Sequence, residues 1–139
     1  GPKNILALEF QPEDGRAIRY LKPPEGGSLT SYFVAGMGYD AGKRQSFDME
    51  TFDKVAINFV DWRPGMNAEV KAGSIDVALI TNYAIEALGP KGFNEAFKQA
   101  HRLLKPKGQL ILFREEQDSN QPLPDAANTL FAVNGTFTE

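Results

Sequence analysis

The stretch from Gly73 to Arg114 constrains the fold of this chain more than any other part of it. Val77–Ile80 is an apolar run short enough for a buried strand. Apolar residues then recur at the spacing of one helix face: Phe93, Ala96, Phe97, Ala100, Leu103 and Leu104. Lys105–Gly108 contains the proline and glycine that stop a helix, and Gln109–Phe113 is a second apolar strand. Buried strands joined by a helix usually pair in parallel, so the stretch predicts the centre of an α/β sheet.

Length and composition narrow the class of protein. The 139 residues suit one domain, 1–139, and 42% of them are hydrophobic, as in ordinary globular proteins. There is no cysteine and one histidine, so we expect no metal site. The net charge of −3 argues against a nucleic-acid partner. No apolar run approaches about 20 residues, so we expect a soluble protein without a membrane span, in the cytoplasm or an organelle interior.

The rest of the chain supplies further elements of the sheet. Strands are expected at Asn4–Phe10, Ser31–Ala35 and Lys54–Val60, with helical turns at Arg16–Leu21 and Met66–Ala72. Polar, proline-bearing composition predicts loops at Lys22–Thr30 and Glu115–Ala127. Near the end, Asn134-Gly135 separates Thr129–Val133 from Thr136–Thr138, which predicts a short β-hairpin at the sheet edge.

The central stretch resembles class I S-adenosylmethionine (SAM) methyltransferases. The residues that carry the resemblance are Ser74-Ile75-Asp76-Val77 and the run from His101 through Leu104-Lys105-Pro106-Lys107-Gly108 to Leu112. The likeness extends from about Ile5 to Phe113, with strands and helices in family order. It implies a Rossmann-like, mostly parallel sheet with an abbreviated C-terminal region. It speaks for the fold more than for activity, because these residues build the sheet.

The resemblance also places a cofactor loop after the first strand. The family pattern is an acidic residue, an apolar residue and then G-x-G-x-G. Glu9 and Phe10 take the first two positions, and the glycine positions fall on Gln11, Glu13 and Gly15, of which only the last is glycine. The family glycines let the backbone approach the cofactor closely, so this loop is interpreted as degraded or as an ordinary strand-to-helix turn.

Other cofactor contacts implied by the resemblance are incomplete. The acid expected after the second strand is represented only by Asp40, which lies a few residues late. Asp61 and Trp62 occupy the place where family members contact adenine, with an acid for its amino group and an apolar neighbour. The equally weighted alternative is that Asp61 caps a turn and Trp62 covers the sheet edge. Cofactor-binding residues, if SAM is bound, would be Glu9, Gly15, Asp61 and Trp62.

A rival cofactor cradle is the glycine-rich segment Gly36–Gly42, which would suit another nucleotide. A lone G-x-G is a weak signal, and Lys43–Asp53 after it is a weak helix, so a flexible loop or a loop that contacts a partner is favoured.

The substrate side of the crevice should be formed by residues that follow the strand at Ser74–Ile80. The carboxyl ends of parallel strands face the ligand in open α/β sheets, which points to Thr81, Asn82 and Tyr83. The N/D-P-P-Y motif of some amino-group methyltransferases is absent here. His101 is interpreted as a solvated helix residue and no catalytic residue is assigned.

Two functional hypotheses follow. The first is a methyltransferase-fold protein that has lost SAM binding, holds no cofactor and acts as an interaction or structural subunit with protein partners in a larger assembly. It depends on Gln11 and Glu13 at glycine positions and on the shortened C-terminal region. The alternative is an active, divergent SAM-dependent methyltransferase that acts on a small molecule or a protein.

Overall fold

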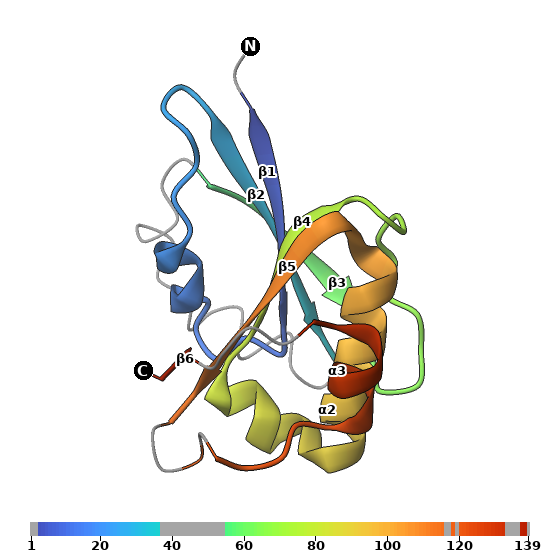
Figure 1. The fold of residues 1–139 in the computed structure, drawn as a ribbon. Coiled ribbons are helices and arrows are strands. Elements are labelled where there is room, and N and C mark those ends of the chain that lie inside the picture. The colour runs from blue at the N-terminus through green and yellow to red at the C-terminus, as the bar shows by residue number, and fades with distance from the viewer. Residues whose placement is uncertain (1–2, 37–54, 116–117, 119, 133–136, 139) are drawn as a thin grey trace.

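The computed structural model describes residues 3–36, 55–115, 118, 120–132 and 137–138. Within these residues the strands form one sheet in the order β3-β2-β1-β4-β5-β6 (Figure 1). The strands are β1 (Asn4–Phe10), β2 (Ser28–Ala35), β3 (Val55–Asp61), β4 (Ile75–Ile80), β5 (Leu104–Arg114) and β6 (Phe137–Thr138). The helices are the short 3₁₀ helix η1 (Arg16–Tyr20), α2 (Asn82–Leu103) and α3 (Asp125–Leu130).

Every strand pair in this sheet is parallel, as the sequence predicted for its centre. Leu79 of β4 lies opposite Ile111 of β5, and Glu9 of β1 lies opposite Phe33 of β2 and Leu79 of β4. The strand order reverses direction at β1, which has β2 on one side and β4 on the other. Such a reversal is where open α/β sheets form their ligand crevice.

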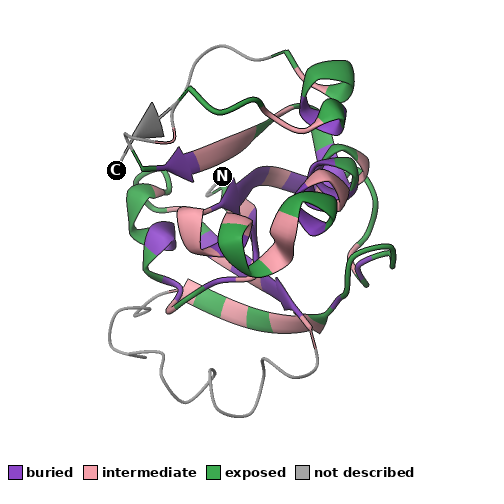
Figure 2. Cartoon of the chain, turned by 90° about the horizontal axis from the view of Figure 1, so that it is seen from below, coloured by how far each residue is buried: buried purple, intermediate pink, exposed green. Residues whose placement is uncertain are grey.

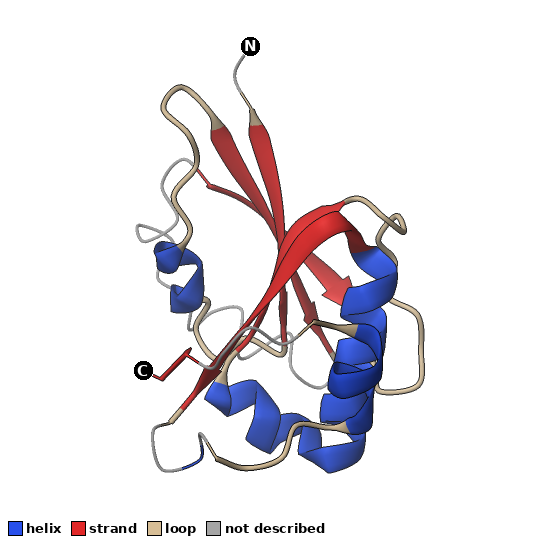
Figure 3. Ribbon diagram, viewed as in Figure 1, coloured by secondary structure: helices blue, strands red, loops and turns tan. Residues whose placement is uncertain are grey.

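The two faces of the sheet are covered by different elements (Figure 3). Leu8 and Phe10 pack on the face that α2 and α3 cover, together with Phe97 of α2. Ala7 and Phe33 pack on the opposite face with η1. Side chains alternate along a strand, so the apolar core is divided into two layers by the sheet (Figure 2).

Helix α2 explains the longest periodic segment of the sequence. Thr81 precedes it, and its hydroxyl accepts a hydrogen bond from the backbone N–H of Ala84 at 3.4 Å, a standard helix start. At Gly89 the backbone leaves the helical region, with φ 71°, and Pro90 follows. The kink has a clear cause, because proline cannot continue the hydrogen bonding of the preceding turn.

Several expected elements differ in the structure. β2 begins at Ser28, inside the predicted loop Lys22–Thr30, and α3 begins at Asp125, inside the predicted loop Glu115–Ala127. Strand β5 begins at Leu104, directly after α2, five residues before the predicted start. Lys105–Gly108 forms a bulge within it, because Ile75 pairs with Leu104 and Val77 already pairs with Gln109. Lys107 makes the bulge with a positive φ of 68°.

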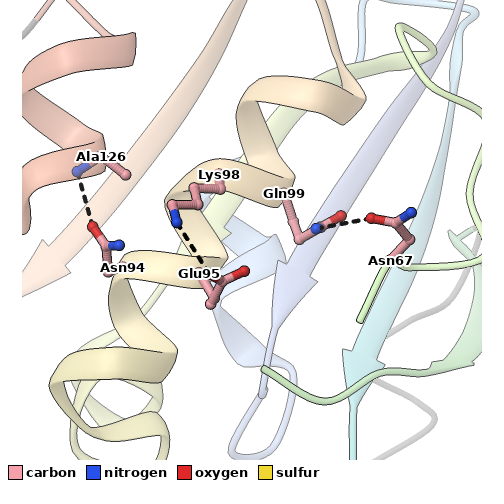
Figure 4. A network of polar contacts seen from close by, with 6 residues as sticks. All are labelled: Asn67, Asn94, Glu95, Lys98, Gln99 and Ala126. Carbon is pink, nitrogen blue, oxygen red and sulfur yellow. Dashed lines mark hydrogen bonds and ion pairs between the residues drawn. The ribbon is translucent and has the colours of Figure 1, made fainter. Parts of the chain in front are cut away.

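The prediction of a helical turn at Met66–Ala72 is wrong. This segment consists of turns and bends, and side chains from α2 bind it (Figure 4). The Gln99 amide donates to Asn67 Oδ1 at 3.2 Å, and the Arg102 guanidinium donates to the Ala68 carbonyl at 3.1 Å. These tertiary contacts take up groups that a local helix would otherwise satisfy.

The predicted C-terminal hairpin is wrong in its first half. Thr129 and Leu130 belong to α3, and β6 pairs in parallel with β5. The turn at Asn134-Gly135 lies outside the described residues. Helix α3 forms because Ala126 and Ala127 are buried against α2, and Asn94 of α2 accepts the Ala126 N–H at 2.8 Å. Packing against α2 overrode the strand signal at Thr129 and Leu130.

Candidate functional site

The carboxyl ends of β1, β3 and β4 meet at one edge of the sheet. Phe10 ends β1, Asp61 ends β3 and Ile80 ends β4. β2 lies between β1 and β3, so these two strand ends are separated by about two strand spacings, roughly 10 Å. Asp61 and the residues that follow β1 and β4 therefore lie along a common edge, the usual position of a ligand crevice.

Glu9 lies inside the sheet rather than at an open surface. It is 1% exposed and lies between Phe33 and Leu79 in the strand register. By strand alternation its side chain shares the η1 face with Ala7. A buried carboxylate is costly and needs polar neighbours.

The loop that follows β1 forms a tight turn although two of the three glycine positions of the family pattern carry other residues. Gln11 has φ 45° and Gly15 has φ 78°, so both ends of the loop use the left-handed region. The Gln11 N–H donates to the Val34 carbonyl of β2 at 2.7 Å. A side chain at Gln11 therefore occupies a backbone position where glycine is favoured.

The same loop is closed by its own acid. Asp14 Oδ1 accepts the backbone N–H of Arg16 at 3.0 Å, and Asp14 Oδ2 accepts from Arg16 Nε at 2.6 Å. The N–H at the first position of η1 is thus occupied by a carboxylate of this chain. η1 is only a five-residue 3₁₀ helix.

Asp61 and Trp62 have different environments. Asp61 is exposed at the end of β3, whereas Trp62 is 1% exposed. The Trp62 ring meets Phe10 edge-on with the centroids 5.3 Å apart, and its indole N–H donates to the Met66 carbonyl. The indole thereby ties the segment after β3 to the core beside β1, on the α2 face.

The three residues predicted for the substrate crevice all follow β4. Thr81 caps α2, while Asn82 and Tyr83 form its first turn. The Asn82 amide donates to Glu115 Oε1 at 3.3 Å, which joins the start of α2 to the residue after β5. Asn82 also lines a neighbouring hollow of about 440 Å³.

This hollow lies between α2 and the segment that follows β5. Its apolar wall includes Ile85, Phe93 and Leu123, and its polar lining includes Asn82, Glu86, Arg114, Asp118 and Gln121. Arg114 is 4% exposed, and its guanidinium donates to the Gln121 carbonyl at 2.9 Å. Sequence reasoning missed Arg114, although a charged residue at the end of the apolar run Gln109–Phe113 was an available signal.

A carboxylate with a shifted pKa lies away from these strand ends. Burial alone would raise the pKa of Asp76, but the Leu6 N–H and the Lys105 ammonium bind the carboxylate and lower the pKa below its ordinary range. The distances are 2.9 Å from Leu6 N to Oδ2 and 3.1 Å from Lys105 Nζ to Oδ1. Asp76 is the second residue of β4, so it fastens β1 to β4 near their amino ends.

Two absences apply to the described part of the chain. No group of three or more histidine or acidic side chains there is arranged to hold a metal ion. None of the helices in the same residues has the length and apolarity needed to cross a membrane. His101 is exposed, as predicted, and its ring meets Phe131 with centroids 5.7 Å apart.

Searches with the sequence found no match: no family model fits the chain. No curated protein matches it either. The fold, in contrast, is similar to several solved structures.

One of these is the glycopeptide N-methyltransferase MtfA complexed with SAM, with a TM-score of 0.54 and 14% identity over 85% of this chain and 48% of that one. Another is a protein from Galdieria sulphuraria that is provisionally described as a sarcosine dimethylglycine methyltransferase. It has a TM-score of 0.50 and 15% identity over 80% of this chain and 40% of that one. A third is a short-chain dehydrogenase from Oenococcus oeni, with a TM-score of 0.51 and 13% identity over 81% of this chain and 62% of that one.

The chain thus spans less than two thirds of the length of each of these structures. At such low identity the likeness concerns the fold alone. The shared architecture agrees with the parallel sheet and with the strand order, which reverses at β1. This chain has the Rossmann-like α/β fold of the class I SAM-dependent methyltransferases.

Proposed function

We propose that this protein uses the methyltransferase fold without binding SAM and acts as an interaction subunit of a larger assembly. The observation that carries the proposal is the closed loop after β1, in which Asp14 binds the backbone N–H of Arg16. In a SAM site that region receives the carboxylate of the methionine part. Here an acid of the chain already holds the donor, and Glu13 beside it adds a second negative charge.

Loss of cofactor binding would remove the catalytic power of such a site. The sulfonium of SAM is already activated, so methyl transfer depends chiefly on binding and in-line positioning. Gln11 supports the same proposal because its side chain adds bulk where the family backbone approaches the cofactor. Trp62 is best explained as a core residue, since its ring is buried against Phe10.

Thermal unfolding with SAM and with S-adenosylhomocysteine at millimolar concentration tests the first part. A ligand that binds only the folded state at about 100 times its dissociation constant adds about 2.7 kcal/mol of stability. We expect no shift for either compound. A matched variant, Gln11→Gly combined with Glu13→Gly, shows whether restoring the family glycines restores binding. A clear shift with the unaltered protein would overturn the proposal.

The second part is tested by the size of the protein in native extract. We expect the endogenous protein to elute well ahead of the purified chain on gel filtration, because it is held in an assembly. Elution at the size of the purified chain would contradict the subunit role.

The alternative is an active, divergent SAM-dependent methyltransferase. It is favoured by the left-handed conformation of Gly15 and by the position of Glu9 and Asp61 on strands that end at one edge. Asp61→Ala should then weaken SAM binding, whereas unchanged affinity would remove Asp61 from the site. The rival cradle at Gly36–Gly42 lies mostly outside the described residues.

A further inference from the structure

The hollow beside β5 is lined by a largely buried cation, Arg114, that forms no ion pair among the described residues. Arg114 is 4% exposed, yet within the described residues its guanidinium makes one hydrogen bond, to the Gln121 carbonyl, and no ion pair. A guanidinium carries five N–H donors. Among the described residues, no Arg114 nitrogen is a buried atom that lacks a hydrogen-bond partner, so the remaining donors open onto the hollow. Guanidinium donors of this kind favour a carboxylate as their partner.

The carboxylates of the hollow limit what that anion can be. Glu86 and Asp118 line the same space as Arg114. A multiply charged anion such as phosphate would be repelled by both acids. A ligand with one carboxylate and one ammonium would satisfy Arg114 and the acids at the same time. The pairing of a carboxylate with arginine is strong and directional.

The apolar wall defines the third part of the ligand. Ile85 and Phe93 of α2 face the hollow together with Leu123 of the segment after β5. A volume of about 440 Å³ is in the range of small-molecule sites, and apolar walls with few polar groups are usual there. We propose that this hollow binds an apolar α-amino acid, with its carboxylate on Arg114, its ammonium toward Glu86 and Asp118, and its side chain against Ile85, Phe93 and Leu123.

This proposal is independent of whether SAM binds. None of the residues that it uses belongs to the loop after β1, and the test measures binding of the amino acid alone. Asn82 is shared with the predicted substrate crevice, and its amide contacts Glu115 at the mouth of the same region.

The test is a calorimetric titration of the full chain with L-leucine and L-phenylalanine, and with three leucine analogues. Leucinamide lacks the carboxylate, 4-methylpentanoate lacks the ammonium, and N-acetyl-leucine imitates the carboxyl end of a peptide. We expect an amino acid to bind and the analogues to bind at least about tenfold more weakly, which corresponds to 1.4 kcal/mol. If neither amino acid binds, or if an analogue matches leucine, the proposal is overturned.

Variants assign the ligand groups to residues. Glu86→Gln should weaken the binding of leucine about tenfold. It should leave the affinity for 4-methylpentanoate unchanged, because that analogue has no ammonium. Glu69→Gln removes an exposed acid outside the hollow and is the matched control. Equal effects of the two variants would overturn the assignment. Arg114→Met should abolish leucine binding. If this variant does not fold, the comparison of Glu86→Gln with the analogues still decides the outcome.

Discussion

The loop after β1 and the hollow beside β5 lie at the same edge of the sheet, but their charges are arranged in opposite ways. In the loop, the Asp14 carboxylate is matched by Arg16 and by a backbone N–H of the chain itself. In the hollow, Arg114 is buried with one carbonyl as its hydrogen-bond partner among the described residues. The Asp14 carboxylate thus has partners within the loop, whereas Arg114 forms no ion pair among the described residues, and we propose a ligand carboxylate as its partner.

This difference separates fold from function. A sheet edge of this fold is not by itself a cofactor site, because side chains of the same chain can bind the backbone groups at that edge. Conversely, a site can arise where family patterns assign none. Each prediction below tests one side of this comparison.

The largest expected effect concerns Trp62, on the cofactor side. Trp62→Ala should lower the free energy of unfolding by about 3–5 kcal/mol, because the ring is buried against Phe10 and its N–H binds the Met66 carbonyl. Urea unfolding measures it, with Trp62→Phe as the milder control. A loss below about 1 kcal/mol would contradict a packing role and favour the ligand-contact interpretation.

Replacing Asp76 tests whether the free energy of unfolding can be lowered without changing the loop after β1 or the hollow beside β5. Asp76→Ala should cost about 2 kcal/mol, since it removes a charged acceptor from Leu6 N–H and an ion pair with Lys105. Because the folded pKa is below the ordinary value of 3.8, Asp76 stabilises the fold above that pH and loses its contribution as pH falls through the folded pKa.

Urea unfolding at several pH values checks this prediction. Between about pH 5 and 3, the free energy of unfolding should fall less steeply in the Asp76 variant than in the unaltered protein. Glu69→Ala, at an exposed position, serves as the control. If the free energy of unfolding of the Asp76 variant falls with acid as steeply as that of the unaltered protein, the assignment is contradicted. A change in leucine binding would show that Asp76, near the amino ends of β1 and β4, is coupled to the hollow at the opposite edge of the sheet.

Arg114 is expected to act in the opposite direction. Without ligand, Arg114→Met should raise the free energy of unfolding by about 1 kcal/mol, because an apolar side chain of similar length relieves the buried charge. Thermal and urea unfolding of the ligand-free proteins measure the change. A loss of about 3 kcal/mol or more would mean that Arg114 is already paired within the folded chain, and the contrast between the two regions would fail.

The smallest effect is expected in the loop after β1. Asp14→Ala should cost about 0.5 kcal/mol, because it removes a hydrogen bond to Arg16 N–H in an exposed turn. We expect SAM to remain without effect on the melting temperature of this variant, since Gln11 and Glu13 still fill the glycine positions. A new SAM-dependent shift would show that Asp14 alone excludes the cofactor.

Several elements of the fold were predictable because their signals are local. The apolar runs and helical spacing between Gly73 and Arg114 predicted β4, α2, β5 and their parallel pairing. The non-glycine residues Gln11 and Glu13 at positions that are glycine in the family pattern were visible in the sequence, as was the acid at Glu9. The buried face of a helix or strand can be inferred from the spacing of its apolar residues, and its ends from proline or glycine. Both inferences use only residues that are close in the sequence.

The errors occurred where distant residues decide the conformation. Thr129–Leu130 is helical because α3 packs on α2, and Met66–Ala72 is irregular because Gln99 and Arg102 bind that segment. The sequence left the role of Trp62 open between a ligand contact and packing, and its contact with Phe10 and its burial depend on residues distant in the sequence.

The sequence by itself determined the parallel α/β sheet and showed that Gln11 and Glu13 stand at glycine positions of the family pattern, since both follow from residue types at fixed spacing. The tertiary structure alone decided that Asp14 closes the loop, that Trp62 is core and that Arg114 is buried beside Glu86 and Asp118. The physical reason is that charge balance and burial depend on side chains from separate elements. β5, α2 and the segment after β5 come together only when the sheet forms.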